Sequence, residues 1–206
     1  MDHIVVDVEI QKTIEETPGG WDATDLLGIS CACVWEYEGQ RMRIYGPDDV
    51  AALQERLLRA DRISGFNIWN FDFPAIWGIS RADWIVSEGY VAPDVSDLQV
   101  ALLPKTDDIL RRIWLSLDLD PDNFDPKTHG GYGLNAVVRA LFNVEKIGYG
   151  GDAPKWFQAG NWARVANYCA DDVALERDLV DFVDRYGFII NPKTGRTFEI
   201  TAPWGE

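Results

Sequence analysis

The stretch IVVDVEI, residues Ile4 to Ile10, decides how the fold is interpreted. Five of its seven residues are Ile or Val, a composition typical of a strand that is covered on both faces in the middle of a sheet. Asp7 and Glu9 stand two positions apart, so both carboxylates point to the same face. Burying them unpaired is costly, so the pair predicts a divalent cation, unless the strand end is exposed and solvent screens both charges.

The segments that follow predict a sheet built partly from meandering strands. Residues 26–37 and 41–46 flank a turn signal at Glu38-Gly39-Gln40 and read as an antiparallel hairpin. A helix of about 48–61 after Pro47 and a short strand at 62–66 come next. The second half predicts helices at about 97–104, 107–117, 133–142 and 161–186, and then a closing hairpin around Asn191 to Gly195.

This order predicts an α/β fold with a mixed central β-sheet flanked by helices. No repeat or convincing linker divides the chain. We therefore expect one domain over residues 1–186, with a C-terminal β-hairpin at 187–206 as an extension of the same domain.

Composition limits the class of protein. The chain has 206 residues, of which 47% are hydrophobic and 26% charged. This composition is typical of a globular protein rather than of a disordered or collagenous protein. It has no apolar run near the length of a membrane span and no signal-like N-terminus, so a cytoplasmic protein with no membrane partner is expected. Cys31, Cys33 and Cys169 lie in apolar stretches and read as small buried thiols, supporting neither zinc nor a disulfide framework.

The net charge of −15, from 34 acidic and 19 basic residues, opposes binding to phosphate backbones and argues against a sequence-reading DNA-binding module. Nucleic acid can still be the substrate if divalent metal ions neutralise an acidic site and contact is limited to one strand end. There, stacking on aromatic side chains supplements charge. Nine Trp, nine Phe and seven Tyr provide such surfaces.

A second acidic position follows the short strand at 62–66. In the stretch Asn67-Ile68-Trp69-Asn70-Phe71-Asp72, Asp72 stands just after a strand end, which is a frequent place for site residues in sheet proteins. The alternative is a helix N-cap, a position that Asp favours.

A third acidic position lies on the long helix predicted at 161–186. Tyr168 and Asp172 are four residues apart and share a face. Helical spacing puts Asp171 on a solvated face, with Asn167, Asp178, Asp181 and Arg185. It puts Asp172 with Val173, Leu175 and Leu179, which should be core. Asp172 is therefore the member of the pair that needs a reason to be buried. The alternative for Tyr168 is a core aromatic with its hydroxyl bonded to backbone.

Taken in order, Asp7-x-Glu9, Asn67-x3-Phe71-Asp72 and Tyr168-x3-Asp172 resemble the three motifs of the DEDD 3′–5′ exonuclease superfamily in its tyrosine-containing branch. The resemblance extends over residues 4–186 and is closest to the proofreading exonuclease domains of family B DNA polymerases and to their stand-alone relatives. Segments around Asn135, Lys146 and Pro154 are similar to stand-alone members. Ile10 stands where many relatives have Thr or Ser, and the loop of residues 11–25 is long.

The resemblance implies a ribonuclease H-like (RNase H-like) fold and a metal-dependent 3′–5′ exonuclease. Such an enzyme releases nucleoside monophosphates from the 3′ end of nucleic acid, with single-stranded DNA as the expected substrate. It implies two Mg²⁺ or Mn²⁺ ions held by Asp7, Glu9, Asp72 and Asp172. Tyr168 would orient the attacking water, and Asn67 and Phe71 would contact the substrate.

Two alternatives keep the same fold. One is a structure-specific endonuclease that uses the same metal site, because end selection depends on the walls of the cleft. The other is a non-catalytic RNase H-like module retained for contacts with a replication or repair protein, which a negative surface would suit. Loss of a carboxylate would mark the second alternative, and none of the four is lost.

Overall fold

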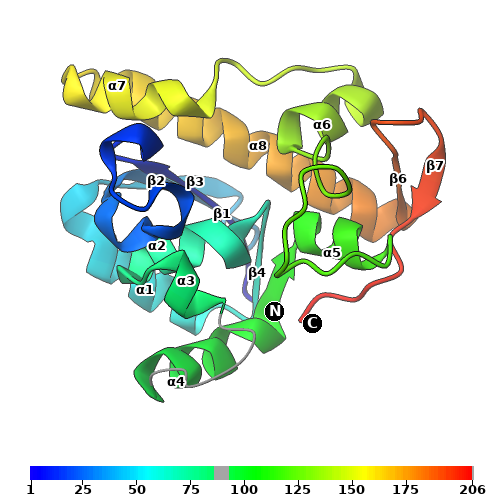
Figure 1. Cartoon of the computed structure of the whole chain (residues 1–206), viewed down its shortest axis with the longest axis horizontal. Helices are drawn as coiled ribbons and strands as arrows, with labels where there is room; N and C mark the ends of the chain where they lie inside the picture. Colours follow the sequence, from blue (N-terminus) through cyan, green and yellow to red (C-terminus); the bar gives the residue numbers. More distant parts are fainter. Residues whose placement is uncertain (86–92, 206) are drawn as a thin grey trace.

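A five-stranded mixed sheet forms the centre of the protein, with strand order β3-β2-β1-β4-β5. The computed structural model describes residues 1–85 and 93–205. The strands are β1 (His3–Ile10), β2 (Ile29–Glu36), β3 (Arg41–Tyr45), β4 (Arg62–Gly65) and β5 (Thr106–Asp108). The segment IVVDVEI therefore lies in the middle strand, as its composition predicts (Figure 1).

Pairing within the sheet changes direction at β1. This strand is antiparallel to β2 and parallel to β4, and β4 is in turn parallel to β5. The predicted hairpin is present, because β2 pairs antiparallel with β3. Asp7 lies opposite Cys33 and Glu9 opposite Cys31, and the register shifts between Glu9 and Ile10. The irregularity therefore falls where the acidic pair ends.

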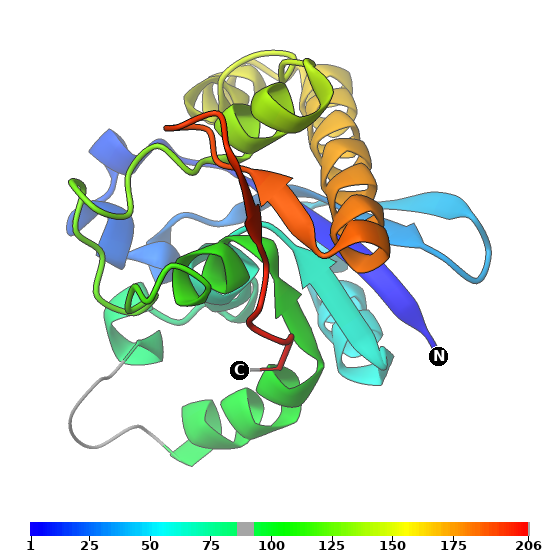
Figure 2. The same ribbon diagram turned by 90° about the vertical axis from the view of Figure 1, so that its right-hand side faces the viewer.

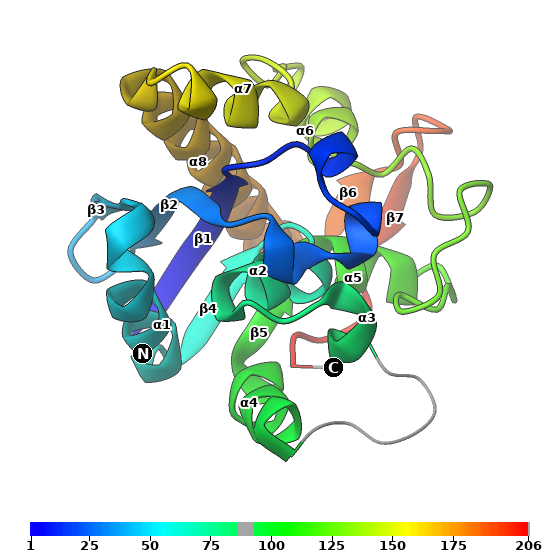
Figure 3. The ribbon, with the colours of Figure 1, turned by 60° about the vertical axis from the view of Figure 1, so that its left-hand side comes forward.

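Helices cover both faces of the sheet. The even-numbered residues Ile4, Val6 and Val8 of β1 pack with α1 (Val50–Arg59) and α2 (Phe73–Trp77). Val5 packs on the other face, with the long helix α8 (Trp162–Tyr186). Figure 3 shows α1 and α2 on one side of the strands and α8 on the opposite side. Strand alternation thus directs Asp7 and Glu9 toward α8.

Five further α-helices lie among the described residues. They are α3 (Arg81–Trp84), α4 (Pro93–Leu102), α5 (Ile109–Leu115), α6 (Leu134–Phe142) and α7 (Ala153–Gln158). The C-terminal hairpin pairs β6 (Phe188–Ile190) with β7 (Thr197–Glu199), as predicted. Figure 2 shows the hairpin beside α6 and the C-terminal end of α8, where Ile189 and Ile200 join their apolar cluster.

The helix expected from residue 107 begins only at Ile109, because Thr106–Asp108 forms the edge strand β5. The buried Asp107 binds Arg62 of β4, and Arg112 donates to it at 2.8 Å. Asp108 caps α5 by accepting from the backbone N–H groups of Leu110 and Arg111. Long-range ion pairs and a cap therefore set the boundary that periodicity placed two residues too early.

Within the described ranges, no helix combines the length and the apolarity needed to cross a bilayer.

Candidate active site

The three predicted motifs meet at one cavity. Its volume is about 660 Å³, and its walls come from β1, from the segment after β4 and from α8. All seven predicted site residues line it: Asp7, Glu9, Asn67, Phe71, Asp72, Tyr168 and Asp172. We call this space the carboxylate cavity. Segments separated by up to 165 positions in the sequence are brought together here because α8 crosses the face of β1 to which Asp7 and Glu9 point.

Three of the carboxylates form a compact group. Side-chain oxygens of Asp7, Glu9 and Asp172 all lie within 4.8 Å of one another. Glu9 is 6% exposed and Asp172 is 2% exposed. Three negative charges this close repel one another strongly unless a cation or protons neutralise them.

Asp72 lines the same cavity from the segment after β4. Its Oδ1 accepts a hydrogen bond of 3.0 Å from the backbone N–H of Val8, the residue between the two carboxylates of the first motif. Asp72 ends a π-helical turn, Ile68–Asp72, which continues into α2. Asp72 therefore follows the end of β4 at Gly65 after one helical turn, and its side chain bonds β1 instead of capping α2.

The turn that carries Asp72 is fixed by two neighbours. Asp108 accepts hydrogen bonds of 2.9 Å from the backbone N–H groups of Asn67 and Trp69. A Cβ at Gly65 would lie 2.4 Å from Ile68 Cγ2 and 2.7 Å from the carbonyl oxygen of Val6. Only glycine therefore lets the chain pass this close to β1.

On α8, the prediction that Asp172 is buried and Asp171 exposed is confirmed. Asp172 is 2% exposed, whereas Asp171 lies on the exposed face. Tyr168 is also buried, and its ring meets that of Trp156 edge-on at 5.6 Å. Its hydroxyl has no hydrogen-bond partner among the described residues. The backbone-satisfied alternative is therefore wrong for Tyr168, whose pKa is raised by burial first and by the charge of Asp172 next.

Lys146 is a site residue to which sequence reasoning gave no role. Its Nζ lies 2.6 Å from Asp172 Oδ2 and 5.4 Å from the centre of the Tyr168 ring. Its backbone N–H donates to Asn135 Oδ1 at 2.9 Å, which anchors the segment before α7. This hydrogen bond between two segments thus holds the Lys146 ammonium group beside the carboxylate of Asp172.

Glu176 is a second residue that the sequence reasoning missed. It lies one helical turn after Asp172, is 2% exposed, and its Oε2 has no hydrogen-bond partner within the described chain. Burial, followed by the charge of Asp7, raises the pKa of Glu176 well above its usual range. Its i+4 spacing from Asp172 was the available signal, because it puts a carboxylate on the same buried face.

Burial is the largest cause of the raised pKa at each of the four predicted carboxylates. It raises the pKa of Asp7, Glu9 and Asp172, and it raises that of Asp72 to about 8. Asp7 Oδ2 and Asp172 Oδ1 have no hydrogen-bond partner in the described structure. Unsatisfied, mutually repelling oxygen donors fit a hard divalent cation such as Mg²⁺ or Mn²⁺.

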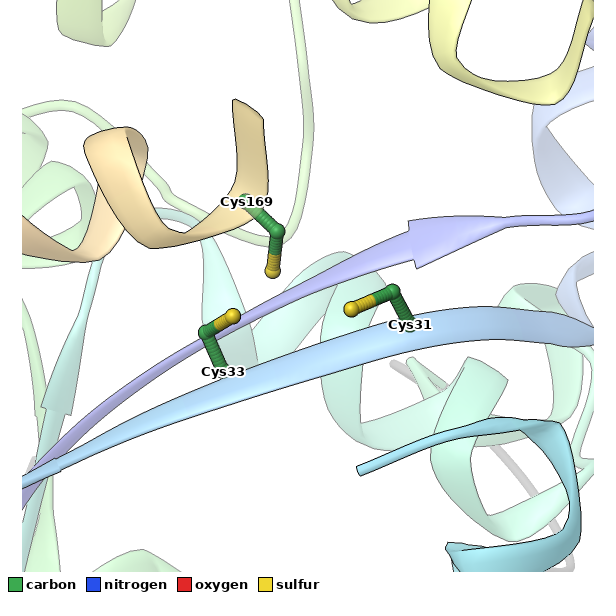
Figure 4. Close-up of side chains that lie close together, drawn as sticks. All are labelled: Cys31, Cys33 and Cys169. Carbon is green, nitrogen blue, oxygen red and sulfur yellow. The ribbon is translucent and has the colours of Figure 1, made fainter. Parts of the chain in front are cut away.

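The three cysteines lie together behind this site, between β2 and α8 (Figure 4). All are free and fully buried, as predicted, and their sulfur atoms lie within 4.8 Å of one another. Cys169 Sγ donates to the carbonyl oxygen of Asp7 at 3.4 Å. Burial raises the pKa of the Cys169 thiol well above its usual range, which keeps it protonated and suited to packing rather than chemistry.

Comparisons with known proteins bear on the fold. Neither the protein-family models nor the curated proteins contain a match to this chain. Among solved structures, the chain is similar to a family B DNA polymerase from the hyperthermophilic archaeon Pyrobaculum calidifontis, with a TM-score of 0.51 and 13% sequence identity. The match covers 89% of this chain and 24% of the polymerase chain. At that identity the likeness shows a shared fold alone, and this chain spans about a quarter of the polymerase.

Proposed function

We propose that the protein is a metal-dependent 3′–5′ exonuclease with an RNase H-like domain at residues 1–186, extended by the hairpin at 187–206. Its substrate is the 3′ end of single-stranded DNA, from which it releases nucleoside monophosphates. The observation that carries the proposal is the meeting of all seven motif residues at the carboxylate cavity. The likeness to part of a DNA polymerase supports a role connected with nucleic acid and leaves room for a replication or repair partner.

The metal-holding residues follow from the carboxylate positions. Asp7, Glu9 and Asp172, whose oxygens lie within 4.8 Å of one another, would hold one Mg²⁺ or Mn²⁺ ion. Asp7 and Asp72, which flank the backbone of Val8, would hold a second, either directly or through water. Two such ions supply an activated water nucleophile and stabilise charge on the attacking and leaving oxygens.

Other residues position the reactants. The Tyr168 hydroxyl, which is not bonded to backbone, orients the attacking water beside the carboxylates. Lys146 balances part of the negative charge at Asp172. Asn67 and Phe71, on the wall next to Asp72, contact the terminal nucleotide. Each of these roles is one of binding or orientation, by which a site reduces the entropy lost in reaching the transition state.

A single-stranded oligonucleotide labelled at its 5′ end tests the proposal in the presence of Mn²⁺. A 3′–5′ exonuclease produces a ladder of labelled products that shorten with time, and Asp7→Asn should abolish it. Asp171→Asn is the matched control, since it removes the same charge from an exposed position.

Other results would contradict the proposal. A single internal cut would instead identify the structure-specific endonuclease. No cleavage of any strand, with or without metal, would favour the non-catalytic interaction module. Full activity in excess chelator would exclude the metal site.

A further inference from the structure

A second cavity adjoins the carboxylate cavity and differs from it in chemistry. Its volume is about 520 Å³, within the range of small-molecule sites. Both cavities share Trp21, Asn67 and Phe71 as wall residues, so a ligand can extend from one into the other. The wall beyond them includes Arg81, Trp114 and Phe124. We call this space the aromatic pocket.

The aromatic pocket has fewer negative charges in its walls than the carboxylate cavity. The chain carries 34 acidic residues, and five of them line the carboxylate cavity. By contrast, no acidic residue is among the described residues that line the aromatic pocket, while Arg81 is. A polyanion therefore meets less repulsion from the walls of this pocket than from those of the carboxylate cavity.

Two large aromatic side chains stand open at the pocket. Trp21 is 63% exposed and Phe124 is 50% exposed. Trp21 meets Phe71 edge-on at 5.7 Å, and Phe124 lies 6.0 Å from Trp114, so each is held by an aromatic neighbour. Exposed rings of this kind are the platforms on which unpaired bases stack.

The walls are held in place before any ligand binds. Arg81 pairs with Asp22, next to Trp21, at 3.0 Å. Asn70 Nδ2 donates to the carbonyl oxygen of Pro121 at 3.0 Å, which ties the segment after β4 to the loop that carries Phe124. A preformed pocket loses little conformational entropy on binding.

We infer that the aromatic pocket is a subsite for the base of the nucleotide that precedes the 3′-terminal one, and that the long loop with Trp21 is what makes this subsite. The inference rests on the proposed function and deepens it. A base can enter only when it is unpaired and unstacked from its neighbours, so the pocket selects a single strand over a blunt duplex.

The test combines a change in the protein with a matching change in the substrate. Oligothymidylate is compared with the same strand carrying an abasic sugar at the second nucleotide from the 3′ end, and with the methyl ester of thymidine 5′-monophosphate, whose leaving group carries neither a base nor an aromatic ring. The variants are Trp21→Ala and Phe124→Ala. Trp162→Ala is the control, because Trp162 is 43% exposed and lines neither cavity.

We expect each pocket variant to raise the KM for oligothymidylate by about 5- to 100-fold, the range for losing a base–aromatic stack. The abasic strand should show the same increase with the unaltered protein and little further increase with the variants. Hydrolysis of the ester by Phe124→Ala should change less than about twofold, because Phe124 lines the aromatic pocket and not the carboxylate cavity.

Three results overturn the inference while leaving the proposed function intact. They are an unchanged KM in both variants, equal slowing of the ester and the strand by Phe124→Ala, and additive effects of the variant and the abasic sugar. If the unaltered protein hydrolyses neither substrate with Mn²⁺, the proposed function itself has failed. In that case, binding of an aromatic peptide in place of the strand would assign the pocket to a protein partner and overturn the inference as well.

Discussion

In the absence of metal, raising the pH from 6.5 to 8 should lower the free energy of unfolding. Burial raises the pKa of Asp72 from its ordinary 3.8 to about 8, so over this interval the folded protein retains a proton that the unfolded chain has lost. Stability then falls as the pH rises toward the folded-state pKa, and it levels off above that value.

The interval begins at pH 6.5 because, below that pH, the titration of His3 changes the free energy of unfolding in the opposite direction. Burial lowers the pKa of His3 from 6.5 to about 4, so its contribution to stability rises with pH and is complete near 6.5. From there to pH 8, one proton at about 1.4 kcal/mol per pH unit gives a loss of about 2 kcal/mol. The raised pKa values of Asp7, Glu9 and Glu176 act in the same direction as that of Asp72.

Urea unfolding followed by tryptophan fluorescence in EDTA measures this loss, since the chain has nine Trp. Asp72→Asn is the matched variant, because an amide oxygen can still accept from the backbone N–H of Val8 while the titration is removed. Its pH dependence should be flatter by about 2 kcal/mol. Mn²⁺ at a hundred times its dissociation constant should restore about 2.7 kcal/mol. Stability that is flat or rising from pH 6.5 to 8 in EDTA, or an unchanged slope in Asp72→Asn, would refute the reasoning.

Three further outcomes are expected on α8. In single-turnover assays at saturating Mn²⁺, Asp172→Asn should lose orders of magnitude in rate while Asp171→Asn changes it by less than about threefold; the reverse order would place the ligand on the exposed face. Tyr168→Phe should lose up to about 10²-fold in the same assay with Mn²⁺ affinity nearly unchanged, and weaker Mn²⁺ binding would speak against a water-orienting hydroxyl. Glu176→Gln should unfold at a higher temperature than the unaltered protein in EDTA at pH 8, because it removes a buried carboxyl group whose raised pKa makes the folded state less stable as the pH rises; a lower melting temperature would show that the group is stabilising.

The local sequence pattern by itself predicted much of the architecture. The β-branched run at Ile4 to Ile10 identified the middle strand, and helical spacing separated the buried Asp172 from the exposed Asp171. The hairpins and the long helix also follow from spacing and turn residues. These features depend on a period of two or about 3.6 residues, which a sequence displays directly. The same patterns, together with the family resemblance, named every motif residue that lines the carboxylate cavity.

Only the tertiary structure decided what depends on contacts between distant segments. Strand β5 has three residues, too few for a period, and it exists because Asp107 binds Arg62 on the neighbouring strand. Lys146 lies beside Asp172, and Trp21 lies between the aromatic pocket and the carboxylate cavity. Both positions depend on how the loops return to the sheet. No local pattern encodes such a return, because its energy comes from ion pairs and packing formed after the sheet and α8 are in place.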